Sequence, residues 1–200
     1  GISCEYILCF LRHLSQDSAF ETLEAAKPYI EHIIGVGLDS SEQGHPPEKF
    51  QQVFSMAKRL GLERVAHAGE EGPAANVANA WQLLEVSRID HGVRCLEDDA
   101  LVEKLAAAKM PLTVCPFSNV KLKVVERLSE HPLPEMLQKG LAVTINSDDP
   151  AYFGGYMSDN FNAVSQAHEM THQELAQFTL NAIEASFISD QEKLTLYLLT

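Results

Sequence analysis

The chain has 200 residues, of which 46% are hydrophobic, so it can bury a sizeable core and fits one domain or two. Acidic residues outnumber basic residues 28 to 15, and the formal net charge of -13 argues against a nucleic-acid backbone or an anionic membrane surface as a partner. The run of about 18 apolar residues that a membrane-spanning helix needs does not occur, and a small-molecule ligand is the favoured partner.

Six short apolar runs typical of strands follow one another along the chain, and each is succeeded by a polar or turn-forming cluster. They are Tyr6–Leu11, Ile33–Leu38, Arg64–His67, Arg88–His91, Pro111–Cys115 and Leu141–Asn146. Segments with helical spacing lie between or after them, such as Pro47–Leu60, Ala74–Val86, Asp98–Lys109, Asn160–Met170, Gln173–Phe187 and Gln191–Leu199. Gly61 and Gly140 are expected to follow helix ends.

Strands that alternate with helices at this interval indicate successive βα units and a parallel sheet, hence the α/β class. Two architectures fit, an open doubly wound sheet and a (β/α)8 TIM-type barrel. An open sheet concentrates its functional residues at one switch point, whereas a barrel collects them from the carboxyl ends of many strands. Chemically capable side chains follow all six runs, which favours the barrel.

A whole barrel needs eight units and roughly 250 residues, but only six units are visible here. We therefore expect residues 1–200 to form a single catalytic-barrel domain that lacks its two N-terminal βα units and ends in helices. An incomplete barrel exposes sheet edges, so a homo-oligomer or a complementing N-terminal segment is expected to cover them.

The four cysteines lie in apolar runs or just beyond one, and no CxxC pair occurs: Cys4, Cys9, Cys95 and Cys115. We expect buried free thiols in a reducing compartment. The chain start, GISCEYILCF, lacks the basic residues of a signal peptide and is expected to lead into a strand. Together these features predict a cytoplasmic location.

Two motifs place a histidine and a glycine after neighbouring strands. In HAGE, His67 ends a strand, Gly69 permits a tight turn, and Glu70 falls near the start of the next helix. In DHG, His91 stands at the matching place on the next strand, with Gly92 behind it. A single histidine there can be structural, but two at the same level are expected to face one pocket.

The third motif, NSDDP at 146–150, ends the sixth run with adjacent acids. Consecutive residues at a strand end point in different directions, so Asp148 and Asp149 can serve different partners, one a metal and the other a ligand. Read alone, the motif also fits a turn that is capped before Pro150.

One pattern, His168–Glu169–Met170–Thr171–His172, matches the H-E-x-x-H of zinc metalloproteases. Thr171 and Glu174, however, form a capping-box pattern that opens the following helix. A helix boundary between the two histidines would spoil their alignment, so we do not favour a protease. The histidines at 13, 32, 45 and 131 are expected to pack or cap.

In this order and spacing, HAGE, RIDHG, CPFSN and NSDDP resemble the adenosine/adenine deaminase family of metal-dependent hydrolase barrels, over essentially the whole chain. Three segments are similar to the adenine deaminase branch: LDSSE at 38–42, CPFSNVKLKVV at 115–125 and SDDPAYFGGY at 147–156. The resemblance implies that five residues line the pocket and fit a free purine base: Asp39, Ser40, Ser41, Glu42 and Gly69.

The resemblance also implies roles for five site residues. His67 and Asp148 would ligate a catalytic zinc ion. Glu70 would protonate N1 of the purine, His91 would orient and help deprotonate the attacking water, and Asp149 would hydrogen-bond N7. Zinc fits this chemistry because it lowers the pKa of a bound water to about 7.

The family places two further zinc ligands in an H-x-H pair on its first strand, and no H-x-H occurs in these 200 residues. We therefore expect one zinc ion per active site, with two histidine ligands from a segment outside this chain. The implied function is hydrolytic deamination of adenine to hypoxanthine and ammonia in purine salvage. The alternatives are adenosine deamination, or a catalytically incomplete barrel that acts only in binding or assembly.

Overall fold

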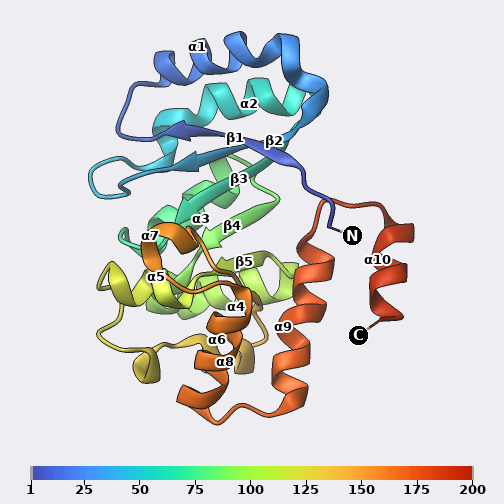
Figure 1. Ribbon diagram of the computed structural model, residues 1–200. Coiled ribbons are helices and arrows are strands. Elements are labelled where there is room, and N and C mark those ends of the chain that lie inside the picture. The colour runs from blue at the N-terminus through green and yellow to red at the C-terminus, as the bar shows by residue number, and fades with distance from the viewer. Residues whose placement is uncertain (1, 200) are drawn as a thin grey trace. The chain divides into compact units, whose positions relative to one another are not determined.

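The computed structural model describes residues 2–199, which divide into two units, unit 1 up to Glu97 and unit 2 from Asp98 onwards. Strands and helices alternate along the chain, as the colours of Figure 1 show. The strand pairs described within each unit are parallel. This arrangement confirms the predicted α/β class.

Unit 1 holds four strands that pair in chain order. They are β1 (Tyr6–Leu11), β2 (Ile33–Asp39), β3 (Glu63–Ala68) and β4 (Arg88–His91). Its helices are α1 (Gln16–Ala26), α2 (Gln51–Arg59) and α3 (Ala74–Leu83), with short 3-10 turns η1 (Lys27–His32), η2 (Pro47–Phe50) and η3 (Val93–Glu97). The register sets His67 beside Asp90 and Ala68 beside His91, so the residues that end β3 and β4 meet.

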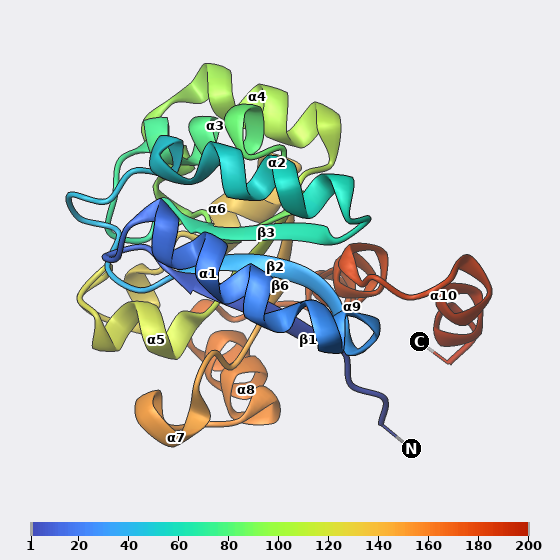
Figure 2. The same cartoon turned by 90° about the horizontal axis from the view of Figure 1, so that it is seen from above.

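Helices α1 and α2 lie next to each other against the strands of unit 1, as Figure 2 shows from above. The Ser15 side chain caps α1 by accepting a hydrogen bond from the Ser18 N–H. Phe10 of β1 and Phe54 of α2 are buried and meet edge to face, with ring centroids 6.0 Å apart. This apolar layer fixes the strands, while polar residues occupy their carboxyl ends.

Unit 2 contains two parallel strands, β5 (Pro111–Val114) and β6 (Ala142–Ile145). Its helices are α4 (Asp99–Ala108), α5 (Pro116–Lys121), α6 (Leu133–Gln138), α7 (Pro150–Phe153), α8 (Met157–His168), α9 (His172–Ala185) and α10 (Asp190–Tyr197), with the 3-10 turn η4 (Leu128–Glu130). Helix α9 packs along β6, where Asn181 Nδ2 donates a hydrogen bond of 2.8 Å to the Val143 carbonyl.

The six predicted strands agree with the observed ones to within one residue at each end. The predicted helix ends at Gly61 and Gly140 are also confirmed, since both glycines follow a helix with φ +78°. The segment Pro47–Leu60 differs, because it divides into η2 and α2. Among residues 2–199, no helix is both long and apolar enough to cross a bilayer.

The four cysteines are free, as predicted, but their burial follows the prediction only in part. Cys95 and Cys115 are buried, whereas Cys4 and Cys9 are exposed, so that the prediction is wrong for this pair. Cys9 lies on β1, which pairs only with β2 among the described strands, and Cys4 precedes the same edge strand. A strand with one neighbour leaves part of its side chains uncovered.

The H-E-x-x-H pattern spans two helices, as predicted. Helix α8 ends at His168, and Glu169 follows with φ +51°. Thr171 and Glu174 form the expected capping box: the Thr171 hydroxyl accepts from the Glu174 N–H, and the Glu174 carboxylate accepts from the Thr171 N–H at 2.8 Å. The two histidines therefore do not share one helical face, which removes the basis for a metalloprotease site.

His131 joins two segments of unit 2 and is buried, with 2% of its surface exposed. Its Nε2 lies 3.1 Å from Asn119 Oδ1, and its Nδ1 accepts a hydrogen bond of 3.1 Å from the Leu133 N–H at the start of α6. This confirms the prediction that His131 packs and caps. Only the neutral ring with its proton on Nε2 satisfies both contacts. Burial, and after it repulsion from His168, lowers the pKa of His131 to about 4.

Unfolding should become easier in acid because of His131. In the unfolded chain His131 binds a proton below about pH 6.5, whereas in the folded state it stays neutral until about pH 4. The contribution of His131 to the free energy of unfolding is therefore fully present above pH 6.5 and is lost as the pH falls towards 4. At pH 4.5 this loss amounts to roughly 2–3 kcal/mol of unfolding free energy. Denaturant unfolding at pH 7 and 4.5 should show a smaller pH difference for His131→Asn than for the wild type. The control His32→Asn, at an exposed site, should show the wild-type change in unfolding free energy between pH 7 and 4.5. If His131→Asn shows the same change as the wild type, His131 is not the cause of the acid sensitivity.

Candidate active site

A tight turn links β3 to α3 and carries the HAGE motif. Gly69 adopts φ +70°, and a Cβ there would lie 2.4 Å from Cγ2 of Val77. The turn is tied to the segment after β4 by two backbone hydrogen bonds, from the Gly92 N–H to the Ala68 carbonyl at 3.0 Å and from the Arg94 N–H to the Gly69 carbonyl at 2.8 Å. Glycine at 69 is therefore required by both its dihedral angle and its close packing.

His67 is the last residue but one of β3, and its imidazole faces a carboxylate of the neighbouring strand. Its Nδ1 lies 3.3 Å from Asp90 Oδ2, and 30% of the His67 side chain is exposed. Burial disfavours the charged imidazole, but the carboxylates of Asp90, Glu70 and Asp39, with Asp90 foremost, together outweigh burial and raise the pKa of His67 to about 9. Sequence analysis did not select Asp90, although it stands in the DHG motif directly before His91.

His91 and Glu70 form the second pair of the site. Glu70 Oε1 lies 3.3 Å from His91 Nδ1, and 10% and 2% of their side chains are exposed. The rings of His67 and His91 meet edge to face with centroids 4.7 Å apart. Burial and then repulsion from His67 lower the pKa of His91 to about 3, so this imidazole is neutral. Three predicted site residues of unit 1 thus form one cluster.

The predicted pocket-lining segment at 39–42 follows β2 and takes up two different environments. Ser40 adopts φ +73°, and its hydroxyl lies 2.8 Å from His13 Nδ1. Asp39 is half-buried, and its buried Oδ1 has no hydrogen-bond partner among residues 2–199. Burial raises the pKa of Asp39, with His67 the largest opposing influence. Ser41 is exposed, whereas Glu42 is 3% exposed and points into the protein.

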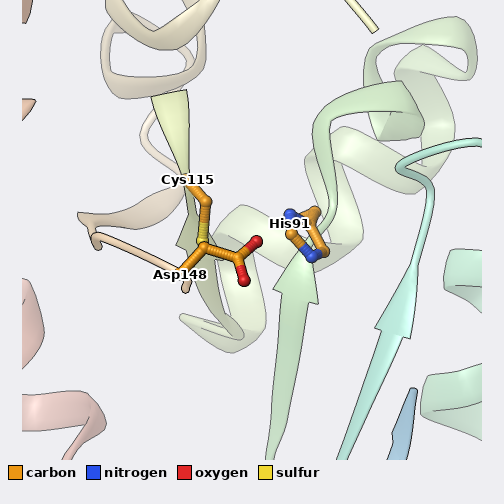
Figure 3. A group of neighbouring side chains, drawn as sticks. All are labelled: His91, Cys115 and Asp148. Atoms are coloured by element: carbon orange, nitrogen blue, oxygen red, sulfur yellow. The ribbon is translucent and has the colours of Figure 1, made fainter. Parts of the chain in front are cut away.

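In unit 2, Cys115 follows β5 and Asp148 follows β6, and Figure 3 labels both side chains. Asp149 comes directly after Asp148. Asp148 adopts φ +55°, and its carboxylate accepts the Asp149 N–H at 2.8 Å. Asp149 caps α7, because its Oδ1 accepts the N–H groups of Ala151 and Tyr152. An oxygen of Asp148 and the Sγ of Cys115 lie within 4.8 Å of each other. The carboxylates of the two acids thus accept from different backbone N–H groups.

A model of the family described as "Adenosine deaminase" matches residues 1–198. The chain belongs to the adenosine deaminase family. Two curated members are named adenine deaminase, one from Vibrio parahaemolyticus with 63% identity over 193 residues and one from Hahella chejuensis with 58% identity over 193 residues. Each alignment covers 96% of this chain, which spans 57% of the first relative and 58% of the second.

Two solved structures show the same fold. The crystal structure of adenine deaminase from Arthrobacter aurescens matches 96% of this chain and 59% of its own with a TM-score of 0.94 and 50% identity. An amidohydrolase from Burkholderia ambifaria with bound Zn matches 98% of this chain and 56% of its own with a TM-score of 0.91 and 28% identity. These likenesses confirm the predicted barrel class of metal-dependent hydrolases.

Proposed function

We propose that the whole protein is a zinc-dependent adenine aminohydrolase, which converts adenine and water into hypoxanthine and ammonia. The observation that carries this proposal is the cluster at the ends of β3 and β4, in which Glu70 pairs with a buried neutral His91 and His67 pairs with Asp90. The names of the relatives at 56–63% identity support adenine as the substrate. Free thiols fit a cytoplasmic setting in purine salvage.

The donor set fits a zinc ion. Asp90 faces Nδ1 of His67, which would leave Nε2 of this ring as the ligating nitrogen, in the carboxylate–histidine–zinc arrangement common at such sites. Asp148 would supply a carboxylate ligand, and two further histidines would come from a segment outside these 200 residues. When bound, zinc supplies a Lewis acid that makes water acidic enough to be deprotonated near neutral pH.

The residues of this chain would divide the proton transfers between them. Glu70 gives a proton to N1 of adenine, which makes C6 more electrophilic. His91, whose Nδ1 faces Glu70, would orient the water that attacks C6 and help to deprotonate it. The amino group takes the proton held by His91 and leaves as ammonia, and the C6 hydroxyl returns its proton to Glu70 as it becomes a carbonyl. One water is thus consumed, and the proton given to N1 stays in hypoxanthine.

Recognition of the base would fall to Asp149 and the segment after β2. Asp149 uses Oδ1 to cap α7, so its other oxygen is the one proposed to hydrogen-bond the purine near N7. Asp39 brings a half-buried carboxyl whose Oδ1 lacks a protein partner among the described residues, and it would suit the N9 proton that adenine has and adenosine lacks.

The test is hypoxanthine formation by the full-length protein from adenine and, separately, inosine formation from adenosine. We expect kcat/KM for adenine to exceed that for adenosine by at least about 10²-fold, because a ribose would displace the polar contacts of the free base. Equal or reversed preference would favour the adenosine alternative. Absence of both activities in the zinc-loaded protein would favour a non-catalytic binding module.

A further inference from the structure

Two buried side chains of opposite charge lie next to the turn that carries Glu70. Arg12 follows β1 and is 0% exposed, and Glu42 follows β2 and is 3% exposed. Arg and Glu are rarely this buried unless they are paired or fully hydrogen-bonded, because removing either charge from water costs several kcal/mol. Their burial therefore calls for a local reason, and their contacts supply one.

The carboxylate of Glu42 accepts hydrogen bonds from four consecutive backbone N–H groups, those of residues 69–72. Oε1 accepts from Gly69 at 2.9 Å. Oε2 accepts from Glu70 and Glu71 at 3.1 Å and from Gly72 at 2.9 Å. Backbone N–H groups that converge in this way form a nest for an anion, which here is a side chain of the same unit. The Glu70 backbone is thus held by a charge-assisted bond.

The surroundings of this nest match its occupant. Asn76 Nδ2 also donates to Oε1 of Glu42, at 2.9 Å. A Cβ on residue 72 would lie 2.4 Å from Oε1 of Glu42 and 2.3 Å from Nδ2 of Asn76, so only glycine leaves room for the carboxylate. In return, the Glu71 carboxylate accepts the Glu42 N–H at 3.0 Å. The two loops therefore hold each other in place.

Arg12 secures the other end of the same turn. Its Nη1 donates to the His67 carbonyl at 2.6 Å, and its Nε donates to the His45 carbonyl at 2.9 Å. Burial lowers the pKa of Arg12, and attraction to Glu42 is the largest influence that opposes this shift. The rigid fork of a guanidinium suits two carbonyls at once, which an ammonium cannot match.

We propose that Arg12 and Glu42 act together as positioning residues: Arg12 fixes the backbone of His67 and Glu42 fixes the backbone of Glu70, so that both side chains keep their places at the ends of β3 and β4. Glu42 was expected in the pocket lining, but its carboxylate is engaged by the turn, so we assign it no contact with the purine; Arg12 has no such contact assigned either. The expected effect on the deamination of adenine rests on the proposed function, whereas the expected effect on the backbone of the turn does not. For this reason the test uses one readout of each kind.

The main variant is Glu42→Gln in the full-length protein. Glutamine offers one acceptor oxygen to five donors and turns an NH2 group towards backbone N–H groups. We expect amide hydrogen exchange at residues 69–72 to accelerate at least about tenfold. We also expect kcat for adenine to fall on the order of 10²-fold, since a displacement of about 1 Å has such an effect, with KM changed less than about threefold.

Three further variants make the result decisive. Glu42→Asp keeps the charge with a shorter side chain, so its kcat should be at least about tenfold higher than that of Glu42→Gln. If Glu42→Gln does not fold, Glu42→Asp takes its place in both measurements. Arg12→Lys should lower kcat about tenfold, because one ammonium cannot bridge the two carbonyls. Glu21→Gln, on the exposed surface of α1, is the matched control and should behave as wild type in both readouts.

Wild-type exchange at residues 69–72 in folded Glu42→Gln would overturn the proposal. So would faster exchange with an unchanged kcat, or a Glu42→Asp variant no better than Glu42→Gln. If the wild-type protein fails to deaminate adenine, the proposed function fails, yet the exchange measurement still decides whether Glu42 holds the turn.

Discussion

Replacement of Glu70 by Gln should lower kcat/KM for adenine by about 10²–10⁴-fold, the range that a general acid supplies. The substitution keeps the size of the side chain and its contact with Nδ1 of His91, which lies 3.3 Å away in the wild type. It removes the proton that we assign to purine N1. Steady-state loss of adenine absorbance with the full-length protein measures the effect.

Two checks accompany Glu70→Gln. Its zinc content and thermal midpoint should equal those of the wild type, because Glu70 is not assigned to the metal. Glu103→Gln, on the exposed surface of α4, should retain wild-type kcat/KM. If the Glu70→Gln protein turns over adenine at a near wild-type rate, Glu70 is not the general acid.

Replacement of Asp148 and of Asp149 by asparagine, one at a time, should have two different effects. Asp148→Asn should lose bound zinc and with it the activity, since a neutral amide is a poor zinc ligand. Asp149→Asn should keep zinc, while its kcat/KM falls by roughly 10–150-fold, as expected for a lost hydrogen bond to a charged group worth about 1.5–3 kcal/mol.

Each variant serves as the structural control for the other. Asparagine can still accept the Asp149 N–H from position 148 and can still cap α7 from position 149. Both proteins should therefore fold, which near-wild-type thermal unfolding of the metal-free forms would verify. Metal analysis after gel filtration gives the zinc content. If both variants lose zinc equally, or if neither does, the division of roles between Asp148 and Asp149 is wrong.

Much of the fold could be predicted because it is encoded locally. Short apolar runs with polar ends located the six strands, and glycine after a helix located the turns at Gly61 and Gly140. The capping box of Thr171 and Glu174 separated α8 from α9. The predicted cluster of His67, Glu70 and His91 followed from the rule that the carboxyl ends of neighbouring parallel strands meet, but the two histidines are not at matching positions, because the register sets His67 beside Asp90 and His91 beside Ala68.

Sequence analysis did not select Arg12, and it placed Glu42 in the pocket lining without finding its contacts to the turn, because both residues act across distant parts of the chain. Glu42 meets the N–H groups of residues 69–72 across 27 to 30 positions, and Arg12 meets the His67 carbonyl across 55 positions. Nothing in the local pattern distinguishes Glu42 from a solvated loop acid, because burial of a charge depends on which loop packs over it. The exposure of Cys4 and Cys9 likewise depends on which strand edges are covered, not on local hydropathy.

The central proposal is that the whole protein, of which this chain is part, deaminates adenine with zinc, and one titration tests it most directly. The full-length protein is stripped of metal with a chelator, zinc is added back stepwise, and hypoxanthine formed from adenine is measured at each step. The account predicts no turnover without metal and full recovery at one zinc per active site. Turnover that survives removal of the metal, or no hypoxanthine at any zinc level in a folded protein, would contradict it.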